Sequence, residues 1–176
     1  MTRDCTECGL CKTRTQIVWG DGSYTAEVMF VGEAPGMHED AEGRPFIGRA
    51  GKILTDMIRE LGLTRKSVFI TNIVKCRPPN NRDPRTEEID ACGHHLDEEI
   101  ERVNPKFICT LGRFSGSYVL NKYGLSMGSM SQVHGLFYKT SDGIVIVPLY
   151  HPAALMYDRH KIPIMKKDLD KIKALL

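Results

Sequence analysis

The sequence lacks any long apolar run. No stretch in its 176 residues approaches the ~18 consecutive apolar residues of a membrane-spanning helix. The N-terminus also lacks the apolar core of a signal peptide, because Arg3, Asp4 and Glu7 interrupt it. These absences predict a soluble cytoplasmic protein that has no membrane partner.

The sequence also has little excess charge of either sign. The formal net charge is +2, which is too small to indicate a nucleic-acid partner by itself. Basic side chains do gather in stretches rich in glycine and proline: Arg44, Arg49, Lys75, Arg77, Arg82 and Arg85. Such loops can contact phosphates, although ordinary solvated loop charge explains them equally well.

No repeat, linker or change of composition divides the chain. Its length suits one domain that buries a core without covalent crosslinks. We therefore expect a single domain over residues 1–176, which begins with a cysteine-rich segment. The cysteines need a reason of their own, because core formation does not require them.

Short apolar runs alternate with helical periodicity along the chain. Strands are predicted at 27–32, 67–74 and 106–112 with a hairpin at 135–150, helices from about 50, 83–86, 113 and 163, and loops after Gly32, at 75–85 and at 122–135. This alternation is typical of an α/β fold with a parallel sheet. Ligands of such sheets bind beyond the carboxyl ends of the strands, which selects the segments after Gly32, Val74 and Pro148.

Six cysteines in a reducing compartment favour metal binding or catalysis over disulfides. Cys5 and Cys8 form a chelating pair, since two intervening residues let both sulfurs face one ion. Cys76, in a proline-rich loop, and Cys92, in a predicted helix, can complete four ligands. Cys109 lies inside an apolar strand and is predicted to be a core thiol.

The spacing of the cysteines leaves the metal open. Cys11 could serve in a ferredoxin-like run, but that motif's fourth cysteine and following proline are missing. Zinc is possible, with His94 or His95 beside Cys92 as nitrogen donors. An iron–sulfur cluster held by four thiolates fits equally well. A crosslink from Cys8 to Cys76 would stabilise the fold by about 4 kcal/mol, so a structural role is sufficient.

Polar side chains follow the predicted strands. Glu39 and Asp40 lie in the first loop, Asn72 at the end of the second strand and His151 after the last. A carboxylate, an amide and an imidazole in one pocket could serve hydrolysis, with Phe46, exposed in its loop, as an aromatic face. Each also has a plain structural explanation: a capped turn, an ordinary bend, or packing on the sheet. The glycines after the first strand lack the GK[ST] ending of a phosphate-binding loop.

Four long motifs resemble one family. They are "VGEAPGMHEDAEGRPFIGRAG", "VFITNIVKCRPPNNRDP", "NPKFICTLGR" and "VPLYHPAALM". From Cys5 to about Leu155 the chain resembles the family 4 uracil-DNA glycosylases, the iron–sulfur type. The resemblance implies a three-layer α/β/α sandwich with a mainly parallel central sheet, and cleavage of the N-glycosidic bond between uracil and deoxyribose, which leaves an abasic site.

The resemblance also implies roles for individual residues. It assigns a structural 4Fe-4S cluster to Cys5, Cys8, Cys76 and Cys92. A base to be excised must leave the stack. The backbone around Glu33, Ala34 and Gly36 would line the pocket for it, Phe46 would stack on uracil, Asn72 would bind its Watson–Crick edge, His151 would hold its O2, and Leu155 would fill the gap in the DNA as an apolar wedge.

Two departures from the family pattern matter. Related glycosylases activate water with an aspartate where this chain, like other family 4 members, has Ala34. Glu39 is then the nearest acid, either to position water and stabilise the sugar cation or to exclude the thymine methyl group. After Leu155 the family continues with Leu-Arg, whereas here Met156, Tyr157 and Asp158 precede Arg159.

Two rival interpretations are a redox protein and a non-catalytic DNA-binding module. The first would require cluster ligands that lie close together in the sequence. The second does not require Asn72, His151 and Glu39 together. As partners we expect uracil-containing DNA, single- or double-stranded, and a replication clamp. We expect the protein itself to be a monomer.

Overall fold

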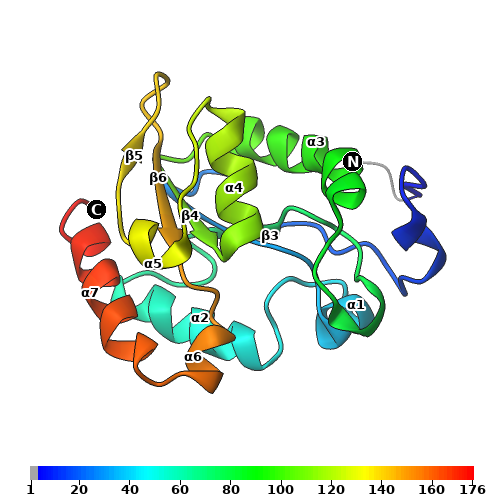
Figure 1. Cartoon of the computed structure of the whole chain (residues 1–176), viewed down its shortest axis with the longest axis horizontal. Coiled ribbons are helices and arrows are strands. Elements are labelled where there is room, and N and C mark those ends of the chain that lie inside the picture. Colours follow the sequence, from blue (N-terminus) through cyan, green and yellow to red (C-terminus); the bar gives the residue numbers. More distant parts are fainter. Residues whose placement is uncertain (1–3) are drawn as a thin grey trace.

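The computed structural model describes residues 4–176. A six-stranded sheet crosses the molecule in the order β1-β3-β2-β4-β6-β5 (Figure 1). Its strands are β1 (Asp21–Gly22), β2 (Val28–Gly32), β3 (Phe69–Asn72), β4 (Phe107–Leu111), β5 (Tyr138–Lys139) and β6 (Val145–Leu149).

The four central strands run parallel, and the short edge strands β1 and β5 run antiparallel to their neighbours. In the register, Gly32 on β2 lies opposite Asn72 on β3. Both strands therefore end at the same edge of the sheet, and their following loops meet there. The mainly parallel sheet predicted from the sequence is confirmed.

Helices cover both faces of the sheet (Figure 1). They are α1 (Met37–Glu42), α2 (Arg49–Glu60), α3 (Thr86–Val103), α4 (Arg113–Lys122), α5 (Met130–Val133), α6 (Ala154–Tyr157) and α7 (Lys161–Lys173), with 3-10 turns at Gly9–Lys12 and Pro79–Asn81. The helices α2 and α7 lie on one side, and α3 and α4 lie on the other. This is the expected three-layer α/β/α sandwich.

Both faces of the central strands are apolar because each face packs against helices. Phe30 of β2 packs in the core formed with α2 and α7, where Leu54 and Leu169 are buried. The next residue, Val31, packs in the core formed with α3 and α4, which includes Leu96. The alternation of neighbouring side chains thus accounts for the continuous apolar run of β2.

The structure corrects some of the expected local elements. Helix α1 lies in the predicted loop after Gly32, and α5 lies in the predicted loop 122–135. Both have six residues or fewer, which is too short for a periodic pattern. Helix α3 has Arg85 at its N-cap, not Asp83 or Thr86, and the Glu88 carboxylate accepts a hydrogen bond from the Arg85 N–H at 2.9 Å.

Lys75 is buried, although the sequence placed it among basic loop residues. Its Nζ donates to Glu99 Oε2 at 2.6 Å, to Thr71 Oγ1 at 2.7 Å and to the carbonyl oxygen of Asn72 at 2.6 Å. The other Glu99 oxygen accepts from the Gly20 N–H at 3.0 Å. Lys75 and Glu99 are 1 % and 0 % exposed, so breaking one partner would leave a buried charge uncompensated. Lys75 therefore holds the end of β3 and does not meet solvent.

Within residues 4–176, no helix combines the length and apolar character needed to cross a membrane.

Candidate active site and cysteine cavity

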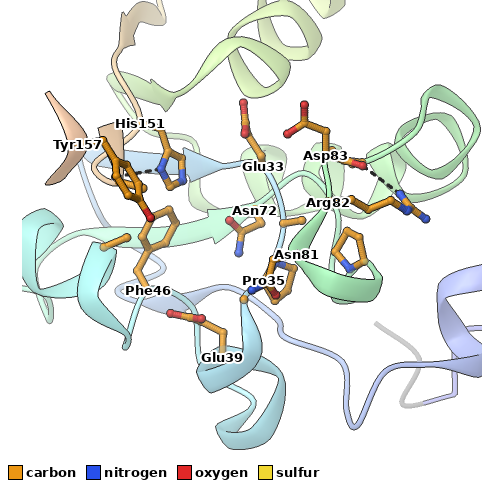
Figure 2. A pocket seen from close by; sticks show the side chains of 16 residues that line it. Glu33, Pro35, Glu39, Phe46, Asn72, Asn81, Arg82, Asp83, His151 and Tyr157 are labelled. Atoms are coloured by element: carbon orange, nitrogen blue, oxygen red, sulfur yellow. Dashed lines mark hydrogen bonds between the residues drawn. The ribbon is translucent and has the colours of Figure 1, made fainter. Parts of the chain in front are cut away.

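A cavity of about 390 Å³ lies at the carboxyl ends of β2, β3 and β6 (Figure 2). It is lined by Glu33, Ala34, Pro35, Gly36, Glu39, Phe46, Ala50, Asn72, Pro78, Asn81, Arg82, Asp83, Pro84, His151, Ala153 and Tyr157. The three segments selected from the sequence therefore meet in one site. Its size suits a small planar ligand.

Asn72 ends β3 and is 1 % exposed, yet its Oδ1 has no hydrogen-bond partner among residues 4–176. A buried amide oxygen without a partner costs about 1–3 kcal/mol, so the fold keeps it there at a loss. Gly32 makes the arrangement possible, since a side chain at this position would overlap both Asn72 Oδ1 and the Phe46 ring. Asn72 thus lines the cavity and carries a buried Oδ1 that is an unused acceptor within the described residues.

His151 follows β6 and faces the cavity across from Asn72 (Figure 2). Its Nδ1 lies 3.1 Å from the Ala153 backbone nitrogen, which donates to it. Loss of hydration in the site lowers the pKa of His151 to about 4, so the ring is neutral at pH 7. A neutral ring that accepts at Nδ1 carries its proton on Nε2. His151 is therefore a neutral N–H donor in the site.

Phe46 forms an aromatic wall of the cavity, but it is not exposed as predicted. Its ring is 6 % exposed and lies 5.8 Å, between centroids, from that of His151. Its backbone has a φ of 52°, which is unusual for a bulky residue. Arg65 stabilises this conformation by donating to the carbonyl oxygens of Pro45 at 2.9 Å and Phe46 at 3.1 Å. The ring is thus fixed in place before any ligand arrives.

Glu39 has a positioning role that the sequence did not indicate. Its Oε1 accepts hydrogen bonds from the Ile47 N–H at 3.0 Å and the Gly48 N–H at 2.9 Å. These contacts tie α1 to the loop that carries Phe46. Within residues 4–176 the second oxygen, Oε2, takes part in no hydrogen bond, and Glu39 lines the cavity.

Glu33, Ala34 and Gly36 line the cavity as expected. The Glu33 carboxylate itself accepts a hydrogen bond from the Phe114 N–H at 3.0 Å, at the start of α4. Burial raises the pKa of Glu33. Its side chain thus links the loop after β2 to a helix N-terminus, where a carboxylate is favoured.

The loop after β3 supplies a wall of the cavity; the sequence selected this segment, but it named none of the residues 77–85 as lining the base site. Arg82 lines this wall but pairs with the Glu88 carboxylate through contacts of 2.6 and 2.9 Å. Arg113 pairs with Asp83 at 2.8 Å, and Arg44 pairs with Asp21 at 3.0 Å. Much of the predicted phosphate-contacting charge is therefore engaged within the chain. The prolines and asparagines of this loop are the feature of the sequence that indicates a rigid wall.

The segment after His151 differs from the expectation for a DNA wedge. Leu155 is 8 % exposed and packs in the core shared with α2 and α7. Its burial does not agree with a side chain that projects into DNA. Tyr157, two residues later, is 83 % exposed and lines the cavity. Figure 2 shows it beside His151 and Phe46. The resemblance implied that the Leu155 side chain projects into DNA, whereas helix α6 turns it toward the core.

A second cavity gathers the cysteines. It is lined by Cys5, Cys8, Cys11, Cys76 and Cys92. The first two come from the N-terminal segment, Cys76 follows β3 and Cys92 lies on α3. Cys109 is fully buried in β4, and burial raises its pKa to about 12, as befits a core thiol. Cys11 borders the cavity as well, although the sequence alone did not place it there.

The geometry of the thiols suits a group larger than one ion. Within residues 4–176, no three cysteine sulfurs lie within 4.8 Å of one another. Each group of three candidate ligand atoms that do lie so close contains at most one cysteine sulfur. Four thiolates on one zinc ion would lie about 3.8 Å apart, given Zn–S bonds of about 2.3 Å. A cluster of several metal ions spaces its thiolates more widely.

Hydrogen-bond donors surround the thiols. Arg14 Nη1 donates to Cys76 Sγ at 3.3 Å, and the Lys75 backbone N–H donates to Cys92 Sγ at 3.3 Å. Burial raises the pKa of Cys76, and that of Cys92 to about 11. These thiols are therefore protonated when free and become thiolates only when a metal binds.

Comparison with known proteins agrees with this geometry. The family model of the uracil DNA glycosylase superfamily matches residues 19–176. The chain belongs to the uracil-DNA glycosylase superfamily. The matched residues include Asn72 and His151 and so cover the whole cavity.

Individual glycosylases of type 4 match over nearly the full chain. A type-4 uracil-DNA glycosylase of Sulfurisphaera tokodaii is 51 % identical over 97 % of this chain and 80 % of its own. One from Archaeoglobus fulgidus is 43 % identical over 97 % of this chain and 87 % of its own. A DNA polymerase of Bacillus phage SP01 is 30 % identical over 89 % of this chain but only 16 % of its own. The glycosylase relatives, unlike the polymerase, have nearly the same extent as this chain.

Proposed function

We propose that this protein excises uracil from DNA by hydrolysing the N-glycosidic bond. The observation that carries the proposal is the buried Oδ1 of Asn72, which has no hydrogen-bond partner in the described part of the chain. Asn72 lines one cavity together with Phe46 and the neutral His151. Uracil supplies the matching groups, since it has a planar ring, an N3–H donor and two carbonyl acceptors. The superfamily membership agrees with this choice of base.

Recognition of the base begins once uracil has left the stack, which costs a few kcal/mol. Phe46 then stacks on the ring, and such stacking returns about 1–3 kcal/mol. Asn72 Oδ1 accepts from N3–H, and its amide nitrogen donates to O4. Cytosine has no N3–H and carries a donor at position 4, so it would leave Asn72 Oδ1 without a partner and lose this match.

Bond cleavage leaves negative charge on the uracil ring. The Nε2–H of His151 donates to O2, where part of this charge gathers, and a neutral donor suffices because the charge is spread over the ring. Water adds to C1′ of the sugar as the C1′–N1 bond breaks, the electron pair of that bond leaves with N1, and the proton that the water loses passes to the solvent. The free oxygen of Glu39 is the acid group available to orient the water or stabilise the cationic sugar.

Tyr157 fills the gap in the duplex in this proposal, in place of Leu155. Replacing Tyr157 by alanine is expected to lower uracil excision from double-stranded DNA about tenfold, because about 1–3 kcal/mol of stacking is lost. Excision from single strands should change less. The matched control is Tyr24→Ala, at a tyrosine that is 42 % exposed and packs on Arg102.

Steady-state rates on paired duplex and single-stranded oligonucleotides measure the difference. Equal losses on both substrates would contradict the gap-filling role. Leu155→Ala, by contrast, is expected to destabilise the fold by about 2–5 kcal/mol as a core truncation.

The cysteine cavity is proposed to hold a 4Fe-4S cluster through Cys5, Cys8, Cys76 and Cys92. Support comes from the four cysteines, which line one cavity, and from the donors Arg14 and the Lys75 N–H. When bound, such a cluster supplies a crosslink between the N-terminal segment, β3 and α3. Purified protein should be brown with about four irons per chain, and removal of iron should lower the melting temperature. A colourless protein with one zinc per chain would refute the assignment.

The activity itself is tested with oligonucleotides that contain one uracil, in single and double strands, without added metal or nucleotide. An abasic product is expected from uracil and not from thymine. Intact substrate in both strand forms would overturn the proposal. A replication clamp as partner and a monomeric state stay predictions.

A further inference from the structure

His95 is the buried polar side chain that the proposed function leaves unused. It is 4 % exposed, and neither ring nitrogen has a hydrogen-bond partner among residues 4–176. A histidine ring has at least one N–H donor in any protonation state. Burying it without a partner costs about 1–3 kcal/mol. A hydrogen-bond partner that is not part of the chain would offset this cost.

The fold directs this ring toward the cysteine cavity. His95 lies three residues after Cys92 on α3, which puts both side chains on the same face of the helix. It lines the same cavity as Cys5 and Cys92. A ring nitrogen of His95 lies within 4.8 Å of Cys5 Sγ.

The ring is also held in a fixed orientation. Trp19 packs edge-to-face against it with 5.0 Å between centroids and an angle of 88°. His94 packs against it with 3.9 Å between centroids and an angle of 42°. His94 itself is 45 % exposed and pairs with Glu7 at 3.5 Å. His94 is therefore exposed to solvent, whereas His95 is buried close to Cys5 and to the Glu7 carboxylate.

We propose that the ring N–H of His95 donates a hydrogen bond to a sulfur of the group held by the cysteines, either a thiolate or a bridging sulfide. The inference rests on the proposed iron–sulfur cluster. His95 is then a positioning residue and not a ligand, because four cysteines already complete the set. Together with Arg14 and the Lys75 N–H, it forms a third donor to the sulfurs.

A hydrogen bond to sulfur has an electrochemical consequence. It offsets the negative charge that a cluster gains on reduction, so it raises the reduction potential. His95→Phe keeps a flat ring of similar size but has no donor. Its potential is expected to shift to more negative values. His160→Phe, at an exposed histidine outside the cysteine cavity, is the matched control and should keep the potential of the unaltered protein.

The experiment uses the cluster-loaded protein and measures iron content first. Visible spectroelectrochemistry then gives the potential of each variant. Pulsed EPR of the reduced cluster follows, on His94→Phe protein labelled with 15N-histidine, and should show a weak nitrogen coupling typical of a hydrogen bond. This second measurement needs no change at His95, so it decides the matter even if His95→Phe fails to assemble.

Each outcome bears on a different statement. Absence of iron would overturn the cluster assignment and the role of His95 with it. Full iron content with an unchanged potential in His95→Phe would overturn the role of His95 alone. Absence of any 15N coupling would do the same. A strong coupling would show that His95 is a ligand and would contradict the proposed hydrogen bond.

Discussion

Replacing Asn72 by alanine is expected to lower the rate of uracil excision by at least about 10²-fold while leaving the protein at least as stable as before. The rate falls because the base loses both of its edge contacts, and sites built on such contacts discriminate strongly. Stability is kept because, within residues 4–176, the Oδ1 of Asn72 has no hydrogen-bond partner that the substitution would remove.

The two measurements are single-turnover excision from a uracil oligonucleotide and a thermal melt. Asn121→Ala is the matched control, at an exposed position on α4 outside the cavity. A melting temperature that falls together with the rate would show that Asn72 supports the fold rather than the base. Wild-type excision in the variant would place the base elsewhere.

Replacing His151 by alanine should lower excision by about 10²–10³-fold, the usual effect of deleting one donor to a developing oxyanion. The pH dependence adds a sharper test. Because the pKa of His151 is lowered from 6.5 to about 4, the ring stays neutral from pH 8 to pH 5.5. The excision rate of the unaltered protein should therefore show no titration near pH 6.5 that is caused by His151.

The same pKa shift affects stability. Between pH 6.5 and about 4 the unfolded chain protonates His151 and the folded chain does not. The free energy of unfolding should therefore decrease as the pH falls through this window, and less so in His151→Ala. His160→Ala, at an exposed histidine outside the cavity, is the control. The neutral donor would be contradicted if the excision rate followed a group of pKa 6.5 and this dependence were lost in His151→Ala.

The positions of Asn72 and His151 could be predicted because they depend on one simple rule. Each follows a buried strand, and parallel strands end at a common edge. The apolar runs of β2, β3 and β6 were sufficient to find that edge. Short motifs that begin at strand ends can thus be located from the order of the residues alone.

Other features depend on contacts between distant residues, which no local pattern reveals. Lys75 was predicted to lie in a basic loop. Its burial depends on Glu99 of α3, which is distant in the sequence, so no local pattern indicates it. Leu155 was predicted to project into DNA, but one turn of α6 packs it on the core. The role of Glu39 in holding the Phe46 loop likewise required α1, which is too short to predict.

The segment from Asn72 to Cys76 belongs to both cavities at once. Asn72 faces the base, Lys75 binds its carbonyl oxygen from below, and the next residue faces the other thiols. Inserting or deleting one residue here would rotate either the amide or the sulfur away from its cavity. The two sites therefore constrain each other, because the spacing between Asn72 and Cys76 sets the position of the amide and of the sulfur together.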